Sequence, residues 1–230
     1  MKFNNIKHII TDIEGTTTSV AFVYDVLFPY FKANINGLKD LVHIEEVQQA
    51  FKATSHLSNK LEDRRLTSVD QIIQTLTRWC NEDRKVTPLK DVQGIIWKKG
   101  YEEGEIKGHI YPDVLGCLKS WTEQGKTLSV FSSGSISAQK LLFGFSESGD
   151  LRPYFIAYHD TNTGTKKDEE TYRKITEELD VNPSNTLFLS DIKEELEAAQ
   201  NAGLQTCQLT RPGIEKNWDI SVADFNEIEF

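Results

Sequence analysis

Six polar residues of this 230-residue chain are of types that can attack an electrophile, move a proton, or hold an anion or a metal ion. One carboxylate can act as a nucleophile while its neighbour transfers a proton. Serine hydroxyls and backbone N–H groups at a helix start bind anions, and a lysine ammonium neutralises a phosphate. A further carboxylate suits Mg²⁺, which takes one or two carboxylates with phosphate and water oxygens. In chain order the six are Asp12, Glu14, Ser132, Ser133, Lys166 and Asp191.

Each residue also has an ordinary structural interpretation. Asp12 stands in a turn-forming Asp-x-x-Gly sequence, and Ser132 or Ser133 could cap a helix. Asp191 could cap a helix too, and Lys166 could be an exposed side chain. Charge favours a joint role, because a phosphate dianion next to two ionised aspartates would be strongly repelled. Mg²⁺ and the lysine ammonium would offset that repulsion, so the set predicts a magnesium-dependent phosphate site.

The elements that must position these residues follow from apolar patterning. Short apolar runs, typical of buried strands, lie at residues 6–10, 127–131, 154–158, 186–189 and 206–209. Helical patterns lie between them at residues 113–123, 136–143, 169–179 and 194–201. Strands that alternate with helices predict an α/β fold with a Rossmann-like parallel sheet. Ligands bind at the carboxyl ends of such strands, where five of the six polar residues stand, with Lys166 just beyond such an end.

The stretch between about residues 19 and 108 breaks this alternation. It contains helical patterns at residues 42–54, 68–84 and 88–107, with no clear strand. Ser68 with Gln71 resembles a capping box, and Pro88 suits a first helical turn. We therefore predict a core of residues 1–18 plus 109–230 and an inserted all-helical cap domain of residues 19–108.

Composition sets limits on partners and location. The formal net charge of −9 argues against binding to nucleic acid or to anionic lipid, while leaving room for one local phosphate site. No apolar run is long enough to span a membrane, and three scattered cysteines form no disulfide or zinc pattern. The sequence has no apolar heptad repeat of the kind that would indicate an obligate oligomer. We expect a monomer in the cytoplasm, and also in the nucleus if the source is eukaryotic.

The order Asp-x-x-Gly-Thr, Ser-Ser-Gly, Gly-x-Lys and Ser-Asp resembles that of the haloacid-dehalogenase-type phosphohydrolases. From about residue 6 to residue 211 the chain is similar to one of their families, the acireductone-forming enolase-phosphatases of methionine salvage. Glu14 is part of this resemblance, because most phosphatases of the superfamily have Asp at that position. The matching stretches are residues 12–18, 25–30, 108–114, 131–135, 138–144 and 189–192.

This resemblance implies a role for each acid. Asp12 would be the nucleophile and a Mg²⁺ ligand, and Asp191 would complete the metal site, with one Mg²⁺ in each subunit. Glu14 would bind Mg²⁺ through its backbone carbonyl, and its side chain would serve in proton transfer. Glu195 falls where the superfamily often has a second acid, with Glu194 as a competing candidate.

The resemblance also implies the substrate and the reaction. Ser132 and Ser133 would hold the substrate phosphate, and Lys166 would neutralise it. The substrate would be 2,3-diketo-5-methylthiopentyl 1-phosphate, which is enolised and then dephosphorylated to the acireductone. Two alternatives stay open: another magnesium-dependent small-metabolite phosphatase of the superfamily, and a non-catalytic binding module on the same fold.

Overall fold

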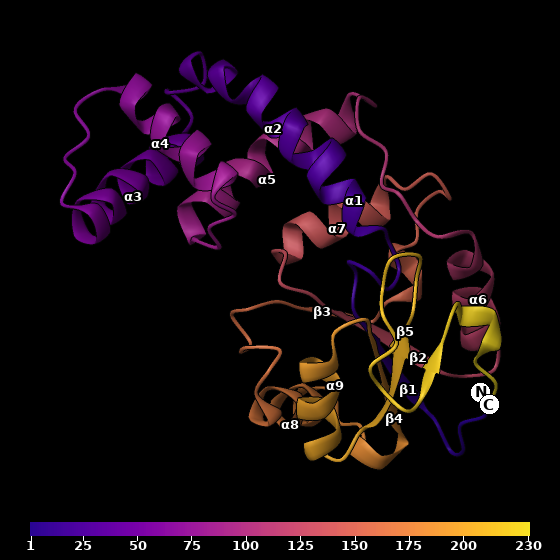
Figure 1. Ribbon diagram of the computed structural model, residues 1–230. Helices are drawn as coiled ribbons and strands as arrows, with labels where there is room; N and C mark the ends of the chain where they lie inside the picture. The colour runs from indigo at the N-terminus through magenta and orange to yellow at the C-terminus, as the bar shows by residue number, and fades with distance from the viewer. The chain divides into compact units, whose positions relative to one another are not determined.

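A parallel sheet carries the polar residues singled out above. The computed structural model describes residues 1–230 and places six strands in the order β3-β2-β1-β4-β5-β6 (Figure 1). Every pairing is parallel, so all carboxyl ends meet at one edge of the sheet. The strands are β1 (His8–Thr11), β2 (Thr127–Phe131), β3 (Ala157–His159), β4 (Thr186–Ser190), β5 (Gln205–Leu209) and β6 (Ser221–Val222).

Strand β1 lies in the middle of this sheet and is buried along its whole length. Its Thr11 pairs with Val130 of β2 on one side and Leu189 of β4 on the other. Apolar β-branched residues such as Ile9 and Ile10 fit a strand that is covered on both faces. The helices of the same unit are α6 (Pro112–Glu123), α7 (Ile136–Gly144), α8 (Glu169–Glu178) and α9 (Lys193–Asn201), with short 3₁₀ turns η3 (Arg152–Tyr154), η4 (Pro183–Asn185) and η5 (Phe225–Glu227).

The chain divides into two units, residues 1–20 with 107–230, and residues 21–106. The second unit is helical and packs around its own core, in which Trp79, Leu76 and Phe31 are fully buried. Its elements, with α1 spanning the boundary, are α1 (Val20–Phe22), the π-helical turn η1 (Val23–Leu27), α2 (Phe28–Asn34), the 3₁₀ turn η2 (Ile35–Lys39), α3 (Glu45–Glu62), α4 (Val69–Asn81) and α5 (Thr87–Glu102).

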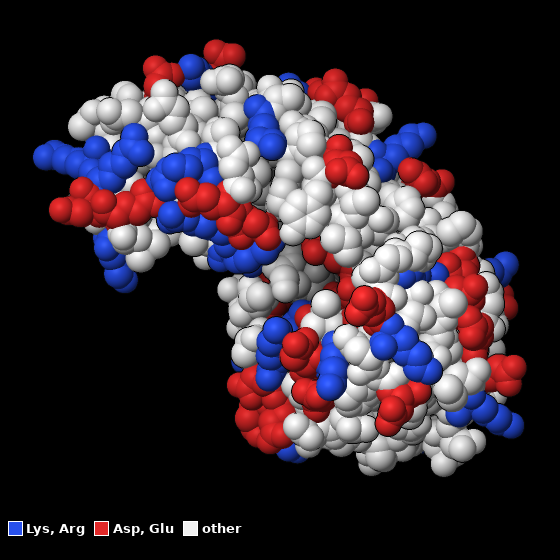
Figure 2. Space-filling view, in the orientation of Figure 1, with Lys and Arg blue, Asp and Glu red and all other residues white.

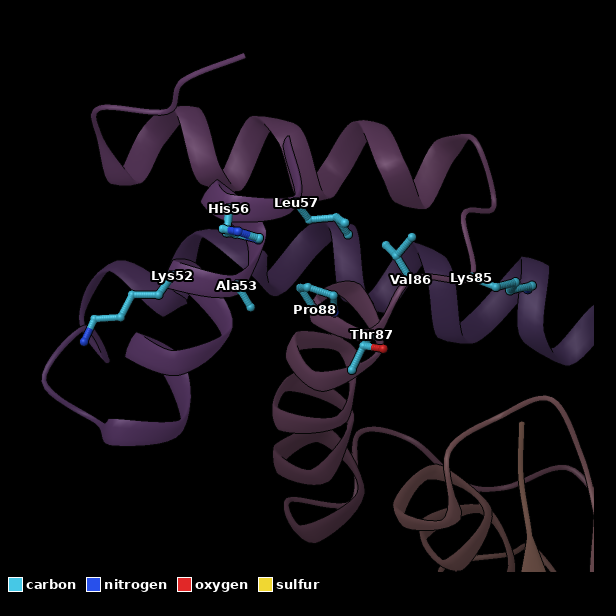
Figure 3. A pocket seen from close by; sticks show the side chains of 8 residues that line it. All are labelled: Lys52, Ala53, His56, Leu57, Lys85, Val86, Thr87 and Pro88. Atoms are coloured by element: carbon cyan, nitrogen blue, oxygen red, sulfur yellow. The ribbon is translucent and has the colours of Figure 1, made fainter. Parts of the chain in front are cut away.

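A pocket of about 680 Å³ lies within the helical unit (Figure 3). Side chains of α3 form one part of its lining, and the two residues before α5 with the first two residues of α5 form the rest. None of its lining residues is acidic, and none is among the six polar residues singled out from the sequence. The lining residues are Lys52, Ala53, His56, Leu57, Lys85, Val86, Thr87 and Pro88.

The predicted α/β class with a parallel sheet is confirmed, and several local predictions need correction. The segment 154–158 is not one strand, because Pro153 lies in the 3₁₀ turn η3 and β3 begins at Ala157. No strand was predicted beyond residue 209, but strand β6 lies there and pairs with β5. Ser68 caps α4 as expected, but Gln71 Oε1 accepts from Thr67 N at 2.7 Å, which is not the bond of a capping box.

The surface visible in Figure 2 carries charged side chains of both signs. On the face shown in Figure 2, Lys and Arg side chains lie beside Asp and Glu side chains over both units. Charges of both signs are therefore mixed on that face. No helix is long and apolar enough to cross a lipid bilayer.

Candidate active site

Asp12 and Lys166 form a buried ion pair at the carboxyl edge of the sheet. Asp12 directly follows β1, and Lys166 lies in the loop after β3. The Lys166 Nζ atom lies 2.7 Å from Asp12 Oδ1, and both side chains are only 6% exposed. The backbone N–H of Ile13 donates to the same Asp12 oxygen at 2.7 Å. These two donors fix the orientation of the Asp12 carboxylate.

Glu195, on α9, is a second carboxylate on the same ammonium. Its Oε2 lies 2.6 Å from Lys166 Nζ and accepts a hydrogen bond from Ser190 Oγ at 2.8 Å. Burial opposes the charged form of Lys166, but the charges of Asp12 and Glu195 outweigh it and raise the pKa of Lys166. Lys166 is therefore a fixed, buried cation and not an exposed surface side chain.

Asp191, directly after β4, gives the cluster more negative charge than one lysine can balance. Burial and the nearby charge of Asp12 raise the pKa of Asp191 to about 7. Burial and the same charge raise the pKa of Glu195 to about 7. Three carboxyl groups thus share one ammonium, and a further cation near them would stabilise their ionised forms.

A tight turn brings the segment that carries Asp12 and Glu14 against Asp191. Gly15 has a φ of +70°, a conformation that favours glycine. A Cβ atom at Gly15 would overlap the carboxylate of Asp191, so glycine also permits this close approach. Glu14 is half-buried in the turn, and its backbone pairs with that of Thr18.

Ser132 and Ser133 lie between β2 and α7, at the same edge of the sheet. The cap of α7 is Ser135, so neither of the two serines has the capping role that was their structural alternative. Ser132 is buried, its N–H donates to His159 O at 3.2 Å, and its Oγ accepts from Gly134 N at 3.2 Å. Ser133 is exposed, which leaves its side chain at the surface of the segment.

The sequence analysis missed one side chain that supports this segment, and the helix-cap alternative for Asp191 is also wrong. Gln139 is buried on α7, and its Nε2 donates to Gly134 O at 2.8 Å and to His159 O at 2.9 Å. Gln139 lies in the stretch of residues 138–144 that matches the resembled family, and this match could have pointed to it. Asp191 is not a helix cap, because the cap position of α9 is Ile192.

The donor set fits a magnesium ion. Carboxylate oxygens are ligands that this hard cation prefers, and the cluster has an excess of negative charge. No group of three or more His, Cys, Asp or Glu side chains is spaced to hold a metal ion. An ion here would therefore rest on Asp12 and Asp191 with backbone, phosphate or water oxygens. Magnesium is commonly bound in this way, with few carboxylates and the substrate phosphate as a further ligand.

Comparison with known proteins agrees with this geometry. Residues 6–203 match the haloacid dehalogenase-like hydrolase family. Enolase-phosphatase E1 of Pseudomonas fluorescens is 46% identical over 226 residues, which cover 98% of each chain. The protein of the same name from Picosynechococcus sp. is 48% identical over 210 residues, covering 90% of this chain and 91% of that protein.

A solved structure extends the likeness to the whole fold. The UTR4 protein of Saccharomyces cerevisiae superposes with a TM-score of 0.81 and 30% sequence identity. The match covers 97% of this chain and 100% of the yeast chain. With sequence, fold and acid cluster in agreement, the chain belongs to the haloacid dehalogenase-like hydrolases and, within them, to the enolase-phosphatases.

Proposed function

We propose that this enzyme is an acireductone synthase that enolises 2,3-diketo-5-methylthiopentyl 1-phosphate and then removes its phosphate. The near full-length similarity to proteins named enolase-phosphatase supports both the reaction and its place in methionine salvage. The single observation that carries the phosphatase step is the buried contact of 2.7 Å between Lys166 Nζ and Asp12 Oδ1. It puts a fixed cation beside the proposed nucleophile, where a phosphate must arrive.

The side of Asp12 that attacks follows from its hydrogen bonds. Both Lys166 Nζ and the N–H of Ile13 bind Oδ1, so we assign the attack on phosphorus to Oδ2. A bond forms between Oδ2 and phosphorus, the ester P–O bond breaks, and the leaving oxygen takes a proton. Water then attacks the same phosphorus, the bond from Oδ2 to phosphorus breaks, the water loses a proton to solvent, and Asp12 and inorganic phosphate are released. Covalent catalysis of this kind divides one difficult step into two easier ones.

The remaining site residues bind and orient the substrate in this proposal. Ser132 and Ser133 donate to the phosphate oxygens, and Lys166 offsets their charge while Glu195 holds its ammonium in place. Glu14 is the candidate that removes the carbon-bound proton during enolisation and protonates the leaving oxygen. Its position two residues after the nucleophile places it on the same turn.

We propose Mg²⁺ as the cofactor, held by Asp12, Asp191 and the backbone carbonyl of Glu14. Bound there, it would polarise the ketone oxygens and neutralise charge on the phosphate. The helical cap role for the inserted residues, the monomeric state and the cytoplasmic location stay predictions.

The test is to incubate the purified protein with the diketo phosphate, with and without Mg²⁺, while enol absorbance and released phosphate are recorded together. An enol signal followed by Mg²⁺-dependent phosphate release is expected. Asp12→Asn is the control, and it should release no phosphate. Release from simple phosphate esters without any enol from the diketone would instead indicate a general phosphatase.

A further inference from the structure

A buried arginine outside the acid cluster holds the far end of the turn that carries Asp12 and Glu14. Arg211 follows β5 and is 4% exposed. Its Nε and Nη2 atoms donate to the backbone oxygen of Thr16 at 3.0 Å and 2.9 Å. Thr16 stands two residues beyond Glu14, so the guanidinium binds the backbone of the catalytic turn directly.

Asp113, at the start of α6, fixes this guanidinium in turn. The Nη1 and Nη2 atoms of Arg211 donate to Oδ1 and Oδ2 of Asp113 at 2.8 Å each, and the Asp113 side chain is 8% exposed. The guanidinium carbon also lies 4.2 Å from the ring centroid of Tyr111 and 5.2 Å from that of Phe225. A planar fork that pairs with a carboxylate and stacks on rings is specific to arginine, and lysine cannot reproduce it.

The turn connects Thr16 to the proposed metal ligands. Gly15, directly before Thr16, packs against the carboxylate of Asp191 so closely that no Cβ would fit. At the other end of the turn, the N–H of Asp12 donates to Leu189 O at 2.9 Å, two residues before Asp191. A displaced Thr16 carbonyl would therefore move Gly15 and the backbone of Glu14 relative to Asp191.

We propose that Arg211, held by Asp113, is a positioning residue that sets the place of the Asp12 turn relative to Asp191. Arg211 touches no reacting atom, and its effect passes through the backbone of Thr16. This inference rests on the proposed function, because it assigns Asp12 and Asp191 to one catalytic and metal-binding site. An ion pair with a purely structural role would stabilise the fold and leave catalysis in the folded enzyme unchanged.

The test compares Arg211→Lys with Arg173→Lys. Arg211→Lys keeps the charge and loses the fork that joins Asp113 to Thr16. Misplacement of a reacting group by about 1 Å costs about 100-fold in rate, and we expect a fall in kcat of that order with little change in KM. Loss of a residue that orients a metal ligand weakens metal affinity about 10-fold to 100-fold, so calorimetry should give a higher Kd for Mg²⁺.

Arg173→Lys is the matched control. Arg173 also joins carboxylates to a backbone carbonyl, through Glu169 at 3.1 Å, Glu170 at 3.0 Å and Asn201 O at 3.1 Å. None of these partners belongs to the acid cluster. Arg173→Lys should keep the wild-type kcat and the wild-type Kd for Mg²⁺.

An unchanged kcat and an unchanged Kd for Mg²⁺ in folded Arg211→Lys would overturn the proposal and leave a purely structural ion pair. If that variant does not fold, Asp113→Asn decides. It keeps the bonds from Arg211 to Thr16 but removes the restraining charge, and kcat should fall if the proposal holds and stay unchanged if it does not. Calorimetry with Mg²⁺ needs no substrate, so failure of wild-type enzyme on the diketo phosphate would count against the proposed function alone.

Discussion

Asp12 and Glu14 stand two residues apart, and the proposed mechanism gives them separate tasks. Asp12 is fixed by two donors on one oxygen, as a nucleophile must be. Glu14 follows on the same turn and is half-buried. The side chain of Glu14 can therefore be altered while the backbone carbonyl proposed for Mg²⁺ is kept.

Glu14→Gln separates proton transfer from phosphate transfer. General acid–base catalysis contributes about 100-fold to 10,000-fold, so enol formation from the diketo phosphate should fall by at least about 100-fold. Hydrolysis of p-nitrophenyl phosphate should be largely retained, because its leaving group needs no proton. Enol absorbance and p-nitrophenolate release measure the two activities. If Glu14→Gln enolised the diketo phosphate at the wild-type rate, Glu14 would not be the group that removes the carbon-bound proton.

Gly15→Ala tests the close approach of the turn to Asp191. The new methyl group would overlap the Asp191 carboxylate, and a positive φ costs a non-glycine residue about 1–2 kcal/mol. Stability should fall by about that amount, and kcat should fall by about 100-fold because the acids move apart. Gly125→Ala is the matched control, since Gly125 has a φ of +79° with nothing within 4 Å of its Cβ position. Equal losses of kcat in the two variants would contradict the argument.

Strand β1 also carries a buried titratable residue that the reaction does not use. His8 is fully buried, with Nδ1 at 2.7 Å from Thr127 Oγ1 and Nε2 at 2.8 Å from Ser129 Oγ. Burial, helped by the charge of His159, lowers the pKa of His8 to about 4. The native state therefore holds His8 neutral where the unfolded chain, with a pKa near 6.5, already protonates it.

The stability that neutral His8 provides is complete above pH 6.5 and is lost as the pH falls toward 4, because the unfolded state then binds more protons. The loss amounts to about 3 kcal/mol. His8→Gln should remove this slope when urea unfolding is compared at pH 7.5, 6 and 5. The raised pKa values of Asp191 and Glu195 change the pH dependence of stability in the opposite direction. Both the wild type and His8→Gln contain these two acids, so their effect cancels in the difference between the two unfolding free energies. Parallel pH profiles for the two proteins would show that His8 has no such effect.

Among the helices and strands, the sequence predicted those whose pattern of apolar and polar residues is complete within the segment itself. The run at 127–131 and the helix starts near residues 113, 136 and 169 agree with the structure to within one residue. The strand predicted at residues 154–158 was wrong, because this apolar run contains both the end of the 3₁₀ turn η3 and the start of the short strand β3. Strand β6 was missed, because its two residues are too few to show a strand-like alternation of apolar and polar side chains. Only its pairing with β5 defines it as a strand.

The predicted site could be located but not assembled from sequence. Asp12, Lys166 and Asp191 were predicted to lie at one edge of the sheet, because parallel strands bring their carboxyl ends to one edge. The contact between Lys166 and Glu195 depends on how a loop and a helix pack, which no local pattern encodes. The role of Arg211 was not predicted for the same reason, because its partners Thr16 and Asp113 lie far from it in the sequence.

For the molecule as a whole, metal binding should be visible as added stability. A ligand that binds only the folded state at about 100 times its Kd stabilises it by about 2.7 kcal/mol. Calorimetric unfolding with Mg²⁺ should therefore shift to higher temperature than unfolding with a chelator. If the two units unfold in separate transitions, the shift should be confined to the α/β unit, residues 1–20 with 107–230.

Asp191→Asn is the control for this stabilisation. It removes one of the two carboxylates proposed to bind the ion and also relieves the excess negative charge. The variant should be as stable as the wild type or more stable in the chelator, and it should gain less from Mg²⁺. An equal gain in both proteins would place the bound ion elsewhere.

The central place of β1 has a consequence for how the chain acquires its structure during synthesis. His8 pairs with Thr127, which lies 119 residues later, and with Thr186 beyond that. The first strand therefore leaves the ribosome long before either neighbour exists, while the helical segment in between has its partners close at hand. Since non-local pairings form slowly and leave apolar surface uncovered, Ile9 and Ile10 stay exposed through most of translation. We therefore expect the nascent chain to be most prone to aggregation before its second strand emerges.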